Sequence, residues 1–199
     1  MTNHTVIVTD HDFADLRAER EVLEGVANVV ELADDVGDVP ADADERLAGA
    51  DAVLNLRYDI DADVINRMDD CRVIARYGIG VDNIAVETAA DRGIPVTNVP
   101  DYCLEEVATH ALSLTLSLAR GLKQYDASVA AGEWDRGAGA PLHRFSTRPV
   151  GVVGYGAIGR EVGARAAALG AGVLASDPFL EAEDLADDPA TLTSFEDLC

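Results

Sequence analysis

Residues 149–179 constrain this chain more than any other stretch. An apolar strand pattern leads into Gly154, Gly156 and Gly159, a helical pattern follows at once, and a second apolar strand ends at Asp177. The first glycine permits a tight turn, the second lets a pyrophosphate approach the backbone, and the third lets the helix pack closely on the strand. Because strand, glycines, helix and terminal acid occur together in this order, the stretch predicts a dinucleotide-binding βαβ unit rather than a plain structural turn.

The chemistry of this unit indicates NAD as the cofactor. The start of the helix offers N–H groups and a positive dipole end to the phosphates. Asp177 lies 18 residues beyond Gly159 (177 − 159), where a carboxylate accepts hydrogen bonds from both ribose hydroxyls and repels the 2′-phosphate of NADP. The candidate cofactor-binding residues are Gly154, Gly156, Ala157, Ile158, Gly159 and Asp177.

The chain is strongly acidic, with a net charge of −22 on 199 residues and Lys123 as its only lysine. The acidic residues are scattered and apolar periodicity continues between them, so disorder does not explain the charge. A solvated acidic surface suits a high-salt cytoplasm, because molar salt shortens the Debye length to about 3 Å and screens the repulsion. The same charge argues against nucleic-acid binding, which needs a basic patch.

Other features favour a soluble cytoplasmic protein without a metal site. No run of about 18 apolar residues predicts a membrane span, and the first residues lack the charged-then-apolar form of a signal peptide. Cys71, Cys103 and Cys199 are odd in number and share no metal-like spacing, so we expect free thiols in a reducing compartment.

Residues 1–101 alternate short apolar strands with helical stretches, which is typical of a parallel sheet covered on both faces. The expected strands cover 5–9, 28–32, 51–56, 72–76 and 95–98, and the expected helices cover 13–24, 61–68 and 86–92. Residues 102–199 begin with a long helix over 104–122, whose apolar positions predict a wide buried stripe. An irregular segment over 127–148, the glycine unit and a final helix capped by Ser194 follow.

Five segments occur in an order that carries a family resemblance. They are 76–84 (RYGIGVDNI), 93–100 (GIPVTNVP), 105–108 (EEVA), 132–134 (GEW) and the glycine unit through Pro178. Together they resemble the D-isomer-specific 2-hydroxyacid dehydrogenases, a family that includes phosphoglycerate and glycerate dehydrogenases and the C-terminal-binding-protein corepressors. The segment 98–108 looks closest to the corepressor-like branch.

The resemblance implies an α/β fold with a flavodoxin-like or Rossmann-like substrate domain over 1–101. Over 102–199 it implies a linker helix, a dimerisation arm and the start of an NAD-binding Rossmann domain, with the active site between the domains. Backbone amides at Ile79 and Gly80 would bind the substrate carboxylate, Ile79 would also touch the nicotinamide, and Arg57 matches an arginine of the site. The alternatives are a mere tight turn for the glycine loop and a solvated loop cation for Arg57.

The chain also departs from the family pattern. Ala157 stands where many members have an arginine that contacts phosphate, and Thr109 stands where an acid is common. The family's catalytic arginine, acid and histidine are expected beyond Cys199. We therefore assign no catalytic residue, and the chain looks like the N-terminal part of a longer enzyme.

None of the four histidines is a catalytic candidate. His110 falls in the apolar stripe of the long helix and is expected to be packed in a core. Loops are expected for His4, His11 and His143.

The leading interpretation is a cytoplasmic NAD-dependent oxidoreductase that interconverts a D-2-hydroxy acid and its 2-oxo acid. It would form a homodimer through 104–148, and the 199-residue chain alone would be inactive. One alternative is an NAD-sensing regulatory module similar to the corepressor branch, and another is an inactive remnant. Turnover of a 2-oxo acid would separate the first two readings, whereas the sequence does not name the hydroxy acid.

Overall fold

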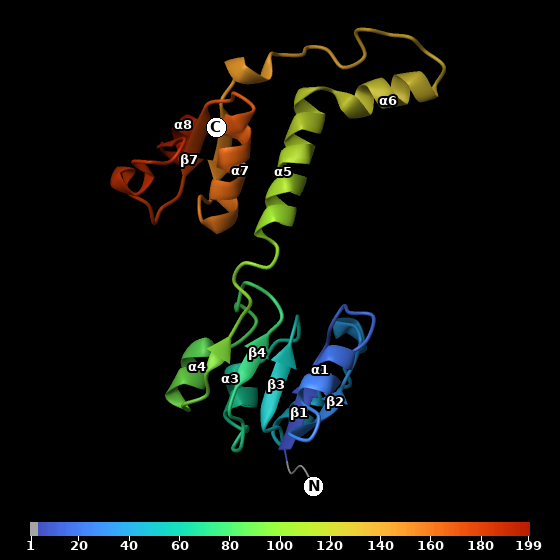
Figure 1. The fold of residues 1–199 in the computed structure, drawn as a ribbon, viewed down its shortest axis with the longest axis vertical. Coiled ribbons are helices and arrows are strands. Elements are labelled where there is room, and N and C mark those ends of the chain that lie inside the picture. Colours follow the sequence, from blue (N-terminus) through green and yellow to red (C-terminus); the bar gives the residue numbers. More distant parts are fainter. Residues whose placement is uncertain (1–3) are drawn as a thin grey trace. The chain divides into compact units, whose positions relative to one another are not determined.

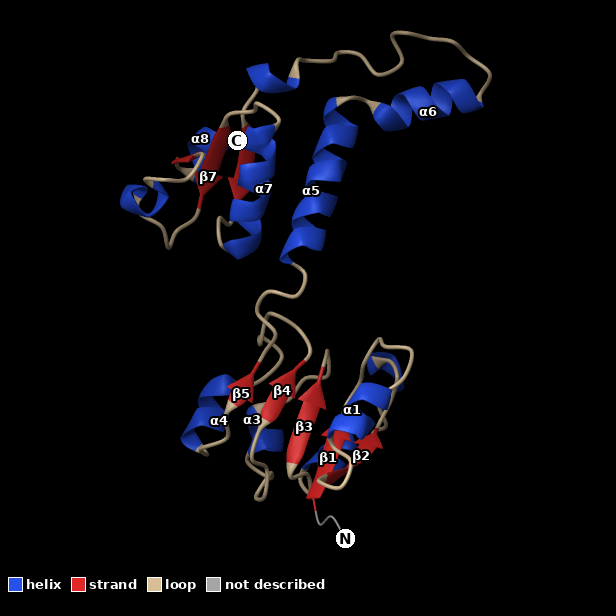
Figure 2. Ribbon diagram, in the orientation of Figure 1, coloured by secondary structure: helices blue, strands red, loops and turns tan. Residues whose placement is uncertain are grey.

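The computed structural model describes residues 4–199 and contains two compact units, each built on a parallel β-sheet (Figures 1 and 2). The first unit ends at Tyr102, and the second runs from Cys103 to Cys199. The parallel sheets with interleaved helices confirm the predicted α/β fold class. Among residues 4–199, no helix is both long and apolar enough to cross a membrane.

The first unit is a five-stranded sheet in the order β2-β1-β3-β4-β5, with every pair parallel. Its strands are β1 (His4–Val8), β2 (Ala27–Glu31), β3 (Ala52–Asn55), β4 (Ile74–Arg76) and β5 (Val96–Thr97). The chain builds β2 on one side of β1 and then returns to the other side for β3, so the sheet has its switch point between β1 and β3. Open α/β sheets bind their ligands outside the carboxyl ends of the strands at such a point.

Short helices connect these strands and cover a continuous apolar core. They are α1 (Arg17–Val22), the 3-10 helix η1 (Val36–Asp38), α2 (Ala43–Leu47), α3 (Ala62–Ile65) and α4 (Val86–Asp91). The core joins Ile7, Val53 and Ile74 of the strands to Leu47 and Ile65 of the helices, all of them buried. Val6, Ile7 and Val8 of β1 are buried in succession, and all three are β-branched, as is typical of a strand covered on both faces.

The second unit begins with helices and ends with a three-stranded parallel sheet in the order β6-β7-β8. Its elements are α5 (Leu104–Ala119), α6 (Leu122–Ala130), the 3-10 helix η2 (Phe145–Thr147), β6 (Val150–Val153), α7 (Ala157–Ala168), β7 (Val173–Ser176), the 3-10 helix η3 (Ala182–Leu185), β8 (Ala190–Leu192) and α8 (Phe195–Leu198). Helices α5 and α7 pack side by side. The core gathers around Tyr155, Val173 and Ala175.

The structure corrects several sequence expectations. The long helix ends at Ala119 because Gly121 has a positive φ of 61°, and α6 then continues into the segment expected to be irregular. The prediction of a wide buried stripe on this helix is wrong, because Ala108 is the buried residue of α5 and Leu118 is 80% exposed. Within this unit α5 packs mainly against α7. Helix α2 and strand β8 were not predicted, while the Ser194 cap is confirmed by a 3.0 Å bond from the Asp197 N–H.

Two of the histidines, His110 and His4, also differ from expectation. His110 is exposed on α5 rather than packed in a core. His4 belongs to strand β1, where its Nδ1 lies 2.8 Å from Asp51 Oδ1. His11 and His143 lie in loops, as expected, and His11 is buried.

Candidate functional site

The predicted substrate-binding residues lie on two neighbouring loops at the carboxyl edge of the first sheet. Strands β3 and β4 are paired in parallel with Asn55 opposite Arg76, so the segments after them leave the sheet side by side. Arg57 stands on the first loop, and Ile79 and Gly80 stand on the second. The topology therefore brings together residues that the sequence separates.

The backbone of Arg57 is held by a hydrogen bond, whereas its side chain is half exposed. Its N–H donates to Asp10 Oδ2 at 2.8 Å. Its guanidinium, whose side chain is 48% exposed, pairs with Asp12 at 2.9 Å. The guanidinium can therefore leave Asp12 for another carboxylate without any change in the backbone.

The glycine loop after β4 has its carbonyl groups engaged by the protein. The Val99 N–H donates to the Gly78 carbonyl at 3.1 Å, and Asn98 Nδ2 donates to the Ile79 carbonyl at 2.6 Å. Arg76 donates to the Gly80 carbonyl and, at 3.2 Å, to the Leu56 carbonyl of the neighbouring loop. Gly78 lies directly against the Arg76 guanidinium, so a Cβ at this position would require that side chain to shift. Arg76 thus braces both loops.

A network of amide side chains also ties the two loops together. Asn83 Nδ2 donates to Asn55 Oδ1 at 2.8 Å and to the Tyr58 carbonyl at 2.9 Å. Asn55 Nδ2 donates to the same carbonyl at 2.8 Å and to Thr9 Oγ1 at 3.0 Å. Sequence reasoning did not single out Asp10, Arg76, Asn55 or Asn83 for these roles. Their common signal is a polar residue at, or soon after, the end of a buried strand.

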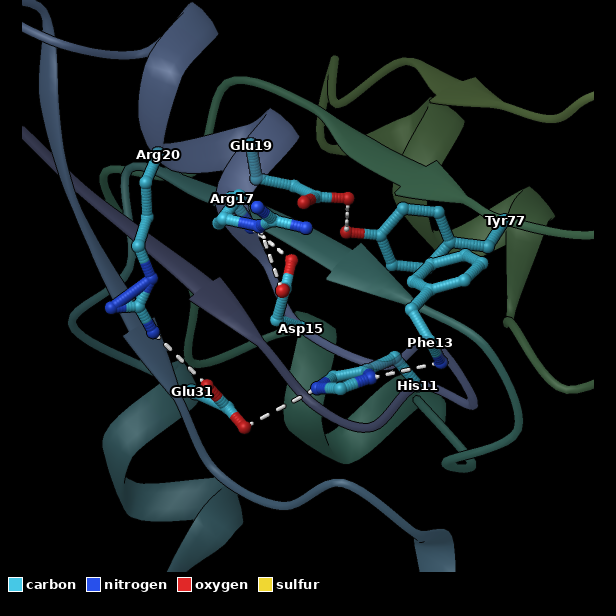
Figure 3. A network of polar contacts seen from close by, with 8 residues as sticks. All are labelled: His11, Phe13, Asp15, Arg17, Glu19, Arg20, Glu31 and Tyr77. Atoms are coloured by element: carbon cyan, nitrogen blue, oxygen red, sulfur yellow. Dashed lines mark hydrogen bonds and ion pairs between the residues drawn. The ribbon is translucent and has the colours of Figure 1, made fainter.

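A second polar network lies beside this edge and includes the buried His11 (Figure 3). Its Nδ1 accepts from the Phe13 N–H at 3.2 Å, so the ring proton sits on Nε2, which is 3.3 Å from Glu31 Oε1. The ring stacks on Phe13, and Phe13 meets Tyr77 edge-on at 5.0 Å. Burial and the bond to Glu19 raise the pKa of Tyr77. The network holds Tyr77, which is the first residue of the glycine loop after β4.

The glycine loop of the second unit has the geometry expected of a dinucleotide-binding turn. Gly154 has a positive φ of 81°, and a Cβ at Gly159 would overlap the Gly154 carbonyl. At Gly156 a Cβ would meet nothing within 4 Å, so the backbone faces open space at the start of α7. Ala157 and Ile158 form the first turn of this helix, where N–H groups lack intrahelical acceptors.

Asp177 and the buried Tyr155 hold this loop from two sides. Asp177 is partly exposed; its Oδ2 accepts from the Tyr155 N–H at 2.8 Å and its Oδ1 from the Phe179 N–H at 2.9 Å. The Tyr155 hydroxyl donates to Asp188 Oδ1 at 2.6 Å, and Arg160 pairs with Asp188 Oδ2 at 2.9 Å. Burial alone would raise the pKa of Asp188, but these hydrogen bonds outweigh it and hold the pKa below its ordinary value.

These features define the class of the molecule. It is an α/β protein whose second unit has a glycine loop with the geometry of a dinucleotide-binding turn, and whose first unit has a sheet with polar loops at its carboxyl edge. Residues 6–194 match the family model of the D-isomer specific 2-hydroxyacid dehydrogenase, catalytic domain. The chain belongs to this family, which confirms the resemblance carried by its motifs.

Individual relatives agree with the family assignment. The chain is 39% identical over 150 residues to D-3-phosphoglycerate dehydrogenase of Mycobacterium leprae, a match that covers 75% of the chain and 28% of the relative. It is 32% identical over 145 residues to glycerate dehydrogenase of Methylorubrum extorquens, covering 70% of the chain and 46% of the relative. The matches thus span roughly a quarter to a half of these curated relatives.

Solved structures show the same fold. D-lactate dehydrogenase from Aquifex aeolicus, complexed with NAD and lactic acid, aligns over 98% of this chain and 57% of its own, with a TM-score of 0.83 and 24% identity. The TT0316 protein from Thermus thermophilus aligns over 98% of this chain and 61% of its own, with a TM-score of 0.78 and 28% identity.

Proposed function

We propose that this chain supplies the substrate-binding unit and the nucleotide-binding loop of an NAD-dependent oxidoreductase. The reaction is reversible transfer of a hydride between a D-2-hydroxy acid and its 2-oxo acid. The observation that carries the proposal is the loop at Gly156, where an open backbone, a helix start and the acid Asp177 meet. The family membership supports the reaction class.

The residues of the second unit fit a dinucleotide. Gly154, Gly156, Ala157, Ile158 and Gly159 present N–H groups and a positive helix end for the pyrophosphate. Asp177 is partly exposed, so its carboxylate can accept from ribose hydroxyls and disfavours a 2′-phosphate. Bound NAD would supply the hydride chemistry, while these residues bind and orient it.

The residues of the first unit fit the carboxylate of a small 2-oxo or 2-hydroxy acid. The carbonyls of the loop at Ile79 and Gly80 already accept protein hydrogen bonds, so these acceptors are turned away from an anionic ligand. Arg57 adds an exposed guanidinium, the group best suited to bidentate carboxylate binding. We assign Arg57, Ile79 and Gly80 to substrate binding, with Ile79 also touching the nicotinamide.

The wider setting follows from surface chemistry. Trp134, 89% exposed, and Leu118 lie within 104–148 and favour homodimerisation there, because large apolar side chains left in water mark interfaces. The charge of −22 favours a high-salt cytoplasm and a small-molecule substrate rather than nucleic acid or a membrane.

Calorimetric titration of the chain in molar KCl with NAD and NADP tests the proposal. We expect NAD to bind and NADP to bind more weakly; absence of NAD binding by a folded chain would overturn it. The 199-residue polypeptide on its own should not reduce pyruvate, glyoxylate or hydroxypyruvate with NADH. None of its four histidines matches the family's acid–base histidine, and such catalysis contributes about 10²–10⁴-fold. Enzyme-like turnover would contradict this expectation.

A further inference from the structure

We propose that Asp10 is the positioning residue of the substrate loop, residues 56–58. Its buried carboxylate fixes the backbone at Arg57, while Asp12 binds the Arg57 guanidinium when no substrate is present. This inference rests on the proposed function, because it assigns a task to the loop that binds the substrate carboxylate. Asp10 itself would touch neither substrate nor cofactor.

The contacts of Asp10 converge on one loop. Asp10 follows β1, is 0% exposed, and accepts hydrogen bonds from the N–H groups of Arg57 at 2.8 Å, Tyr58 at 3.1 Å and Leu56 at 3.4 Å. The Thr9 hydroxyl donates to the same carboxylate at 2.8 Å. Three successive amides therefore wrap around one anion across the β1–β3 switch point of the sheet.

The energetics make this arrangement restrictive. A buried charge is costly unless hydrogen bonds replace its lost hydration. Among the described residues, the partners of Asp10 are three amides and one hydroxyl rather than a cation. The carboxylate has its full set of hydrogen bonds only when the N–H groups of residues 56–58 point toward it. The buried charge therefore fixes the position from which the Arg57 side chain extends.

Asp12 plays the complementary part at the surface. Its carboxylate lies 2.9 Å from the Arg57 guanidinium, and both side chains are about half exposed. A substrate carboxylate would present the same chemistry to the same group, so it competes with Asp12 for the guanidinium. The two acids, two residues apart, therefore have opposite effects on binding: Asp10 favours it and Asp12 competes with it.

The pair Asp10→Asn and Asp12→Asn tests this directly, since each removes one negative charge near an anion site. If only charge mattered, both variants would bind the pyruvate anion more tightly, because each loses a carboxylate that repels it. We expect Asp12→Asn to bind pyruvate about two- to fivefold more tightly, the range of an exposed ion pair. We expect Asp10→Asn to bind it about tenfold or more weakly, because an amide group cannot accept from every donor around it. Asp69→Asn, whose side chain is 85% exposed, is the matched surface control.

The measurements use the whole chain in molar KCl. Pyruvate affinity comes from amide chemical-shift titration, and hydrogen exchange of the Arg57 and Tyr58 amides reports the loop without any substitution. NAD affinity and thermal unfolding of each variant report whether the fold survives. A merely structural role would lower stability while leaving the pyruvate affinity of the folded fraction unchanged.

Each outcome decides something. Asp10→Asn that binds pyruvate as tightly as the parent chain overturns the inference, as does free exchange of the Arg57 amide in the parent chain. The exchange measurement on the parent chain remains decisive even if Asp10→Asn does not fold. A parent chain that binds NAD and protects this amide, but binds no pyruvate, overturns the substrate assignment of Arg57 instead and removes the basis of the inference.

Discussion

Both units place an acid after a buried strand and use it to hold a neighbouring loop, yet the two acids differ in what they leave free. Asp10 is fully buried and receives three backbone N–H groups and a hydroxyl. Asp177 is partly exposed and receives one N–H from the glycine loop and one from its own turn. The first acid is fully engaged by the protein, whereas the second still has surface to offer a ligand.

The units also differ in charge. Residues 1–102 contain 23 acidic and 8 basic side chains, a net of −15, whereas residues 103–199 contain 14 and 7, a net of −7. Units of similar length therefore carry very different self-repulsion. The comparison separates a strongly acidic unit that contains a buried carboxylate, Asp10, from a less acidic unit whose corresponding carboxylate, Asp177, is partly exposed.

Salt should produce the largest difference between the units. At low ionic strength the Debye length reaches about 30 Å, and near 1 M it falls to about 3 Å. Because folding stability is only about 5–15 kcal/mol, a few kcal/mol of repulsion decides whether the first unit folds. Hydrogen exchange between about 0.05 and 2 M KCl should show protection rising more in the first unit than in the second. Equal gains, or a flat response, would break the charge comparison and the halophilic interpretation.

The next effect should separate the two acids themselves. Asp10→Asn leaves buried donors without a full set of acceptors and should cost about 2–3 kcal/mol. Asp177→Asn should cost under about 1 kcal/mol, because water reaches the donors it leaves. It should also narrow the preference for NAD over NADP. Denaturant unfolding, followed by hydrogen exchange in each unit, measures these two losses of stability. Equal losses in the two variants would contradict the difference in burial between Asp10 and Asp177.

Two glycines of the second unit should respond in opposite ways. Gly159→Ala places a Cβ against the Gly154 carbonyl and should destabilise the unit by about 1–3 kcal/mol. Gly156→Ala points its Cβ into open space, so its thermal midpoint should stay near that of the parent while its NAD affinity falls. A Gly156→Ala chain that binds NAD normally would show that the dinucleotide does not approach this backbone.

The sequence predicted what depends on local pattern. The glycine unit, the alternating strands and the Ser194 cap were readable because turn, period and cap each need particular residues within a short span. It could not reveal that Asp10 and Asp177 differ, because each is simply an acid after an apolar run. Their burial is set by residues far away in the chain, such as the loop 56–58 around Asp10.

The same limit explains the errors on α5 and the histidines. A wide apolar stripe predicts burial, but what covers it is a tertiary fact, and within the second unit only one face meets α7. His11 lies in a loop as expected, but its burial, its stacking on Phe13 and its contact with Glu31 were not predictable. Neither partner is identifiable from the residues around the histidine.

The smallest predicted effect concerns the tyrosines that donate to acids. Tyr58 donates to Asp44 at 2.7 Å, much as Tyr155 donates to Asp188 in the second unit. Burial and the bond to Asp44 raise the pKa of Tyr58 from 10.0 to about 12. The neutral phenol is thus favoured in the folded state, so its contribution is fully present below pH 10 and is lost as the pH rises toward 12.

Unfolding of the first unit followed between pH 9 and about 12 should therefore show a falling stability. Tyr58→Phe should make this decline shallower without abolishing it, because Tyr77, whose pKa is also raised, still ionises. Tyr125→Phe lies in the second unit, where its hydroxyl donates to the exposed Arg136 carbonyl and not to an acid, so it controls for the loss of a tyrosine outside the unit that is followed. The slope should persist in this control. A Tyr58→Phe chain with an unchanged slope would show that the alkaline loss arises elsewhere.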